Sequence, residues 1–270
     1  MNRRVMIGLT AAAGLVCYAS TLRNLTVLWW NDEDLGHCFI VPVAAIWIIW
    51  RERDRWLNVP AEPSWWGIPV LLLGAAMQTV AVLGVGEFTR AVSLLVSIVG
   101  AVLALGGFRI LRIWAFPLGL LVFMLPKLVA AYNQVTLPLQ LLAARMAAGL
   151  LSSLDVVVLR SGNVLTLGGH SVAVAEACSG LRYLLALGFV AALFGYMAGT
   201  RLWIRAALLV AAVPLAIIGN ALRVAVSGYV PALSTGTLHE IAGAVIFALC
   251  VGGVILLRLL LLAVPQRHHV

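Results

Sequence analysis

The sequence is poor in charged residues and has almost no lysine. Only 10% of its 270 residues are charged, and Lys127 is its sole lysine. The formal net charge is nevertheless +8 at pH 7, because basic residues outnumber acidic ones by 18 to 10. The arginines lie between long apolar runs, which is typical of residues that set the orientation of a membrane protein. A broad solvated basic face is not expected, so nucleic acid is not predicted as a partner.

Cysteine is also scarce and is not regularly spaced. The four cysteines are Cys17, Cys38, Cys178 and Cys250, and none belongs to a C-x-x-C motif. Most of them lie inside apolar runs. This pattern indicates neither a disulfide framework nor a zinc site, so no metal and no cofactor are expected.

Hydrophobic residues are present in excess. They make up 63% of the chain and give a mean hydropathy of +1.07. A bilayer is crossed by about 20 apolar residues in a helix, so we expect one all-α polytopic membrane domain, residues 1–270, with about eight transmembrane helices. The predicted runs are 5–22, 38–50, 67–84, 91–107, 113–125, 181–199, 206–226 and 239–262.

The arginines predict the orientation of these runs. Basic segments occur at residues 3–4, 51–55, 109–112 and 201–205, whereas most acidic residues fall in the intervening loops. Cytoplasmic loops of membrane proteins are rich in arginine, so both termini are predicted to be cytoplasmic. No convincing small-residue cleavage site follows the first run, so it is expected to remain as an anchor.

Residues 127–180 separate the five spans expected in 1–125 from the three expected in 181–262. Residues 127–151 mix apolar and polar side chains and predict an interfacial or partly buried amphipathic helix, broken near Pro138. Residues 155–174 contain β-branched stretches separated by Ser-Gly-Asn and Gly-Gly, which predict a small antiparallel β element. Open sheet edges do not survive in lipid, so this segment is expected on the outer face of the membrane.

The β element leads to Cys178, which lies between Glu176 and Arg182 and just before the apolar run that starts at Leu181. The N-terminus of a helix favours a thiolate, which is the reactive form of cysteine. Cys178 is therefore a candidate nucleophile. The alternative is a small apolar residue packed inside a membrane helix.

The predicted topology brings two further residues to the same side of the membrane. Arg223 lies near the outer end of its run, and His239 lies at the start of the next. A charged side chain in an apolar helix is costly and is often functional. The alternatives are an arginine that extends to the interface and a histidine that is a surface residue or a satisfied polar group. Together with Cys178, the two residues would supply a nucleophile, a base and a fixed cation at one depth.

The chemistry of each side chain suggests its role. Cys178 would attack a carbonyl, and His239 can accept and return a proton near neutral pH. Arg223 stays protonated, so it would bind an oxyanion or a substrate carboxylate. Supporting roles are predicted for the neighbouring residues: Ser179 and Gly180 allow close approach and offer N–H groups, and Glu176 and Arg182 pair or orient the site.

Three segments together resemble a known family, the exosortases and the related archaeosortases. Residues 176–182, Glu-Ala-Cys-Ser-Gly-Leu-Arg, resemble their cysteine motif. Residues 220–224, Asn-Ala-Leu-Arg-Val, resemble their arginine motif, which adds Asn220 to the supporting residues, and His239 resembles their downstream histidine. Residues 36–42, Gly-His-Cys-Phe-Ile-Val-Pro, are similar to their N-terminal Ser-His-Gly-Phe-Leu-Val-Pro-type signature, apart from its serine and its glycine.

The resemblance implies a multi-pass cysteine transpeptidase-like enzyme of the bacterial inner membrane, with its active site facing the periplasm. Its partners would be membrane lipid and exported proteins with a PEP-CTERM-type C-terminal sorting signal. The tail would be cleaved through an acyl-thioester on Cys178, and an acceptor such as a lipid amine or water would resolve the thioester. In this family the arginine is described as a proton donor. Because a guanidinium is a poor acid, a stabilising role for Arg223 is preferred here. The roles of His37 and His170 stay open.

Other functions are compatible with a polytopic membrane chain. A transporter would concentrate its buried charges near the bilayer midplane, often on repeated broken helices, whereas the polar groups here cluster at the predicted outer surface. A scaffold without chemistry would not need these three side chains at one depth. An enzyme that acts on lipid or polysaccharide precursors could share both the location and the nucleophile.

Overall fold

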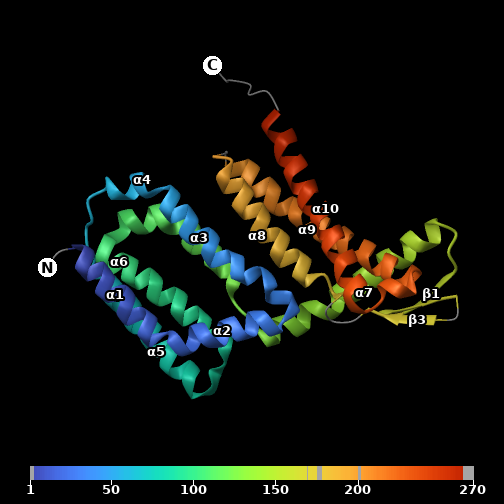
Figure 1. Ribbon diagram of the computed structural model, residues 1–270, viewed down its shortest axis with the longest axis horizontal. Coiled ribbons are helices and arrows are strands. Elements are labelled where there is room, and N and C mark those ends of the chain that lie inside the picture. The colour runs from blue at the N-terminus through green and yellow to red at the C-terminus, as the bar shows by residue number, and fades with distance from the viewer. Residues whose placement is uncertain (1–2, 169, 175–177, 200–201, 264–270) are drawn as a thin grey trace. The chain divides into compact units, whose positions relative to one another are not determined.

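The computed structural model describes residues 3–168, 170–174, 178–199 and 202–263. The chain divides into two compact units, Met1–Leu128 and Val129–Val270 (Figure 1). The first unit contains α1 (Arg3–Cys17), α2 (Ala19–Asn31), η1 (Glu33–Phe39), α3 (Ile40–Arg51), α4 (Arg53–Leu57), α5 (Gly67–Val80), η2 (Ala81–Val85), α6 (Glu87–Leu120) and η3 (Leu121–Met124). The second contains α7 (Val129–Ser153), β1 (Val158–Ser161), β2 (Val164–Leu167), β3 (His170–Ala173), α8 (Leu181–Met197), α9 (Leu202–Tyr229), η5 (Pro231–Leu233) and α10 (Gly236–Ala263).

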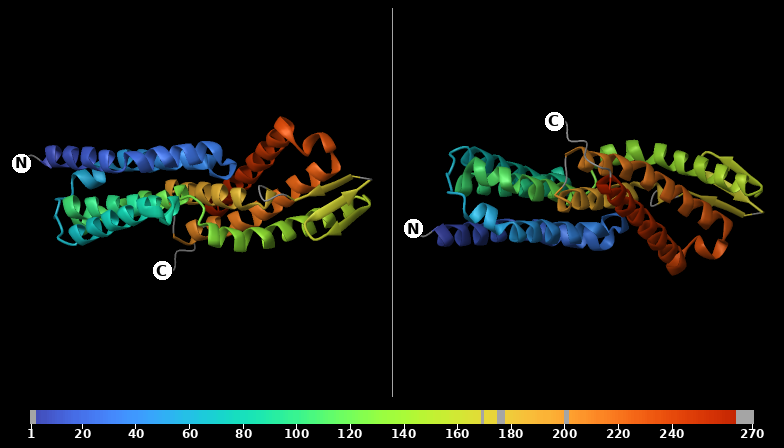
Figure 2. Two further views of the ribbon diagram at one scale, coloured as in Figure 1. Left: turned by 90° about the horizontal axis from the view of Figure 1, so that it is seen from below. Right: turned by 90° about the horizontal axis from the view of Figure 1, so that it is seen from above.

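Helices α5 and α6 pack side by side in the first unit, as both views of Figure 2 show. Their close approach depends on glycine. A Cβ atom added at Gly100 of α6 would lie 2.8 Å from the backbone nitrogen of Leu71 in α5, and one at Gly74 would collide with Ser97. Small residues at helix crossings let backbones approach closely, which is the main source of packing energy inside a membrane.

Helix α6 (Glu87–Leu120) contains the residues expected to form two separate spans at 91–107 and 113–125. Gly107, at the end of the first of these runs, has non-helical backbone angles (φ +77°, ψ −174°), which divide α6 at a kink into two helical segments. A Cβ atom at this position would collide with the carbonyl of Glu62. Glycine alone adopts this backbone conformation readily. The chain therefore turns at Gly107 between two helical segments, and their assignment as two spans stays a prediction.

An ionic cluster joins the C-terminal end of the first unit to the residues that follow α2. The Lys127 ammonium lies 2.6 Å from the Asp34 carboxylate and 2.9 Å from that of Asp32. Burial opposes the charged form of Lys127, but the hydrogen bonds and charges of the two aspartates raise the pKa of this ammonium above its usual value. The segment that precedes α7 is thereby fixed to the acidic turn after α2.

In the second unit, a three-stranded antiparallel sheet packs against α7 and α9 (Figure 1). Its order is β1-β2-β3, with Arg160 opposite Leu165 and Leu165 opposite Val172. This confirms the predicted β element. Alternate residues of β2 face the core, because Leu165 and Leu167 are buried and Thr166 is exposed. They pack on alanines of α7 and on Val224 and Ala225 of α9.

Helices α8, α9 and α10 form the second core of this unit. Tyr183 and Leu187 of α8 pack with Leu208 and Ala216 of α9 and with Ile246 of α10. The predicted start of the sixth run at Leu181 is confirmed, because α8 begins there. This core places three helix ends beside the β sheet, and the candidate site lies among them.

Helix α7 departs from the prediction for residues 127–151. It is continuous through Pro138, so the expected break is wrong. Its own Ala143, Ala144 and Ala147 lie in the core, and their small side chains bring the helix close to α9. This packing offsets the hydrogen bond that the proline removes. The segment 131–153 is also long and apolar enough to cross a membrane, so its interfacial placement stays a prediction.

The chain is a multi-pass membrane protein by the length and composition of its helices. Six helices of the described residues could each cross a bilayer, and the pair Val5–Cys17 and Ala19–Asn31, bent by 62°, gives a seventh if it counts as one span. Helix α8 is apolar but shorter, with 17 residues. The fold is all-α apart from the small sheet, as predicted. The number of about eight spans and their orientation stay predictions.

Candidate active site

The three predicted catalytic residues meet at one end of the bundle formed by α8, α9 and α10. Cys178 lies three residues before the first residue of α8, Arg223 lies in the last turns of α9, and His239 lies in the first turn of α10. The chain leaves α9, passes through η5 and returns along α10, which brings the last two residues side by side. The convergence expected from alternating helix directions is therefore present in the structure.

The imidazole of His239 is the centre of the cluster. Its Nε2 atom lies 3.8 Å from the Cys178 sulfur and 2.8 Å from an Nη2 nitrogen of Arg223. On the other side of the ring, Nδ1 lies 2.8 Å from the carbonyl oxygen of Leu233 and 3.2 Å from the hydroxyl of Ser227. Both nitrogens thus have polar partners, and these partners fix the plane of the ring.

The same partners determine which nitrogen of His239 carries the proton. A carbonyl oxygen only accepts hydrogen bonds and a guanidinium only donates them. Nδ1–H therefore donates to the carbonyl of Leu233, and the lone pair of Nε2 accepts from Arg223. This tautomer turns the basic nitrogen toward Cys178, as a base that removes a thiol proton requires.

Arg223 is held in a closely fitted cradle. Its side chain is 5% exposed, and its guanidinium carbon lies 5.9 Å from the centre of the Tyr183 ring. A Cβ atom at Gly243 of α10 would lie 2.9 Å from the Nε atom of Arg223, so only glycine leaves room for the guanidinium. The Tyr183 hydroxyl donates to the carbonyl of Gly243 at 2.5 Å, which joins the two walls of the cradle. The cation is thereby aimed at His239.

A second set of contacts holds the loop of the cysteine. The side-chain Nδ2 of Asn220 donates to the carbonyl oxygen of Cys178 at 2.8 Å. Gly180 has a φ of +92°, and a Cβ atom there would lie 3.0 Å from the Asn220 side chain. Glycine is thus required at this position both for its backbone angle and for space. Asn220, three residues before Arg223 on the same face of α9, couples the nucleophile to the cation.

The remaining predicted residues are placed as follows. Ser179 is buried, and its hydroxyl accepts the N–H of Leu181 at 3.4 Å, while Arg182 is half-buried at the start of α8. Glu176 lies outside the described residues, so its pairing with Arg182 stays a prediction. His37 lies in the first unit, where its Nε2 is 3.9 Å from the Cys38 sulfur. The part of the chain that the structure describes holds no cluster of three or more potential metal-ligating side chains.

Sequence reasoning missed Tyr183, Ser227, Leu233 and Gly243. Two of them could have been found from helical spacing, because residues four apart share a face of a helix. Ser227 is four residues after Arg223, and Gly243 is four residues after His239. The carbonyl of Leu233 carries no signal in the sequence, since every residue offers one.

This arrangement can perform acyl transfer. It combines a thiol, a base with its lone pair turned toward that thiol, a group that fixes the base, and a permanent cation beside both. In the structure Arg223 donates to the same Nε2 that would remove the thiol proton. The guanidinium must therefore find another acceptor before the base can act, and a substrate oxygen is such an acceptor.

Comparison with known proteins is consistent with this site. A family model described as Transmembrane exosortase (Exosortase_EpsH) matches residues 29–256, which include all three residues of the cluster. No curated protein and no solved structure matches the chain.

Proposed function

Because the chain belongs to the transmembrane exosortase family, we propose that it is a membrane-embedded cysteine transpeptidase that cleaves the C-terminal sorting tail of exported proteins. Family membership supports a membrane enzyme of the sorting type. The finer proposal includes a PEP-CTERM-type tail, an acyl-thioester on Cys178, and transfer to a lipid amine, another nucleophile or water. The observation that carries it is the contact of Cys178 and Arg223 with one nitrogen of His239.

The first step is attack of Cys178 on the carbonyl carbon of the scissile peptide bond. His239 Nε2 takes the thiol proton, and the sulfur–carbon bond forms as the carbonyl π electrons move onto oxygen. The Leu233 carbonyl, which accepts from Nδ1–H, stabilises the imidazolium produced in this step. Collapse of the intermediate breaks the carbon–nitrogen bond, and the imidazolium returns its proton to the leaving amine. The thioester remains on the enzyme.

Arg223 acts in this scheme as an electrostatic stabiliser. The guanidinium keeps its proton at neutral pH, so a proton-donor role would require a base far stronger than a peptide nitrogen. Its buried position inside the Gly243 and Tyr183 cradle strengthens its interaction with a developing negative charge. When the carbonyl oxygen of the substrate becomes an oxyanion, Arg223 transfers its hydrogen bond from Nε2 to that oxygen.

The proposed location is the periplasmic face of the bacterial inner membrane. The site lies at the ends of three apolar helices and next to an antiparallel sheet, and open sheet edges are not tolerated in lipid. A substrate with its own transmembrane helix would present the peptide that flanks this helix at the same depth.

Co-expression with a tail-bearing reporter tests the proposal. The enzyme with Cys178→Ala, Arg223→Ala or His239→Ala should leave the reporter intact. The enzyme with Cys17→Ala, a change at an exposed cysteine of the first unit, should cleave it normally. Mass spectrometry of the trapped enzyme should detect the reporter fragment on Cys178. Release of the tail by the Cys178→Ala enzyme would refute the proposed chemistry.

A further inference from the structure

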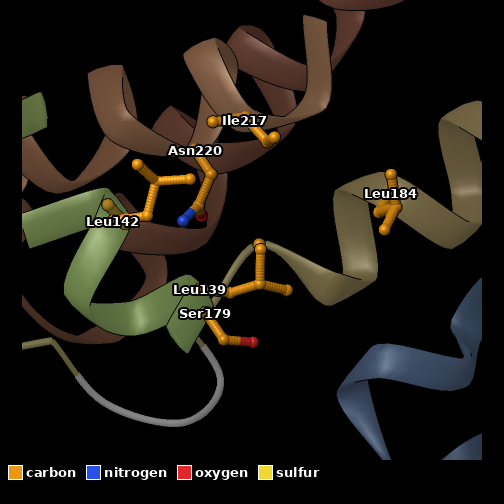
Figure 3. A pocket seen from close by; sticks show the side chains of 8 residues that line it. Leu139, Leu142, Ser179, Leu184, Ile217 and Asn220 are labelled. Carbon is orange, nitrogen blue, oxygen red and sulfur yellow. The ribbon is translucent and has the colours of Figure 1, made fainter. Parts of the chain in front are cut away.

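A small pocket lies beside the loop of the candidate nucleophile (Figure 3). Its walls come from three helices and from the two residues that follow Cys178. They are Leu139, Leu142 and Ala143 of α7, Ser179 and Gly180 of the loop, Leu184 of α8, and Ile217 and Asn220 of α9. The pocket is therefore apolar except for Ser179 and Asn220.

Asn220, which lines this pocket, carries an unsatisfied acceptor. The side chain is 2% exposed, and its Nδ2 is used by the carbonyl of Cys178. Since that carbonyl only accepts, the orientation of the amide is fixed, and the oxygen Oδ1 points away from it. Oδ1 has no hydrogen-bond partner within the described residues. A buried acceptor without a partner loses its hydration and gains no hydrogen bond in exchange, so a donor is expected to bind there.

We infer that this pocket is a substrate subsite, which receives an apolar side chain next to the bond cleaved at Cys178, while Asn220 Oδ1 accepts the backbone N–H of the same residue. A peptide supplies both an apolar group and a donor in one residue. A lipid acyl chain would fill the apolar walls and leave Oδ1 unpaired. The leucines, Ala143 and Ile217 of the walls suit an apolar side chain.

The inference rests on the proposed function and adds a specificity-determining element to it. Asn220 then has two tasks. Its Nδ2 positions the loop of the nucleophile, and its Oδ1 positions the substrate relative to this loop. Ser179 and Gly180, the two residues that follow Cys178, line the same pocket. A side chain bound there therefore lies beside the loop that carries the thiol.

Substitution at two adjacent leucines of α7 tests the inference. Leu142 lines the pocket, whereas Leu141 does not, and the two side chains are almost equally exposed, at 36% and 37%. The full-length enzyme in membranes would be assayed with tail-bearing reporters in which each residue flanking the cleaved bond is glycine, alanine, valine, leucine or tryptophan. Cleavage by the parent enzyme and its loss in Cys178→Ala are measured first, so that failure of the proposed function is seen separately.

At one flanking position, Leu142→Trp should reduce cleavage of the valine and leucine reporters about 10-fold or more relative to the glycine reporter, and Leu142→Ala should extend cleavage toward larger side chains. Leu141→Trp should leave the size preference unchanged. In a synthetic peptide, replacing the N–H of that residue by an ester oxygen should lower kcat/KM about 10-fold or more, because Oδ1 is then left without a donor.

Equal effects of the two tryptophan variants on all reporters would overturn the inference and leave the pocket a packing defect or a water site. A change in dependence on lipid composition without a change in peptide preference would overturn it in favour of an acyl chain.

Discussion

The substitution Gly243→Ala separates the stability of the protein from its activity. Gly243 lies within α10, where alanine normally stabilises a helix by about 0.5–1 kcal/mol relative to glycine. Its new methyl group would lie 2.9 Å from Nε, 3.1 Å from Cζ and 3.3 Å from Nη2 of Arg223. Ordinary contacts begin near 3.4 Å, so the guanidinium has to retreat by about half an ångström or more.

The two effects on stability have opposite signs. Overpacking of a buried site costs about 1–3 kcal/mol, and the helix propensity of alanine offsets part of it. The displaced guanidinium, however, loses its 2.8 Å contact with His239 Nε2. It also loses the position from which it would donate a hydrogen bond to the oxyanion of the proposed reaction. Misplacement of a catalytic group on this scale lowers rates about 10- to 100-fold, which corresponds to about 1.4–2.7 kcal/mol in the barrier.

Reporter cleavage and enzyme abundance in the same membranes would measure both quantities. Gly252→Ala is the matched control, because Gly252 lies on the same helix and has open space around its Cα. We expect normal abundance for both variants and reduced cleavage for Gly243→Ala alone. Full activity of Gly243→Ala at normal abundance would refute the claim that the position of Arg223 controls the reaction.

Three further substitutions have distinct expected outcomes. Ser227→Ala should lower kcat a few-fold and change its pH profile without changing KM, because one of the two groups at His239 Nδ1 is removed. Gly180→Ala should reduce cleavage and thiol labelling, since its φ of +92° costs an alanine about 1–2 kcal/mol. Asp34→Asn should lower the melting temperature in detergent more than Asp32→Asn does, because the Asp34 side chain is 7% exposed and that of Asp32 is 25% exposed.

Each of these predictions has a control. Ser227→Thr keeps the hydroxyl and should restore the pH profile. Gly162 also has a positive φ, of +63°, but it lies in open space, so Gly162→Ala should retain activity. The raised pKa of Lys127 means that its contribution to stability is complete below its unfolded pKa and is lost only as the pH rises through the folded value. The difference between the two aspartate variants should therefore persist from about pH 6 to pH 9. Equal melting temperatures would contradict the burial argument.

The convergence of the site could be predicted from the sequence because helix direction alternates. A residue before one apolar run, a residue near the end of the next, and a residue at the start of the third must share one end of the bundle. The small sheet was also predictable, since its β-branched residues are separated by turn residues at positions 162 and 168–169.

Packing decides what the sequence could not show. Pro138 reads as a helix break, yet α7 passes through it. The elements packed against α7 determine this outcome, and local propensity is the weaker effect. In the same way, the requirement for glycine at position 243 appears only when α9 and α10 pack together. A Cβ atom there would contact the side chain of Arg223, which belongs to α9.

The fixed imidazole has a kinetic consequence. Since Nδ1–H of His239 is bound to the carbonyl of Leu233, every proton that enters or leaves the reaction passes through the opposite nitrogen. The released tail must take its proton there and depart before an incoming nucleophile can be deprotonated in the same place. Under the proposed chemistry the two substrates cannot occupy the enzyme together, and steady-state rates should show parallel lines in double-reciprocal plots.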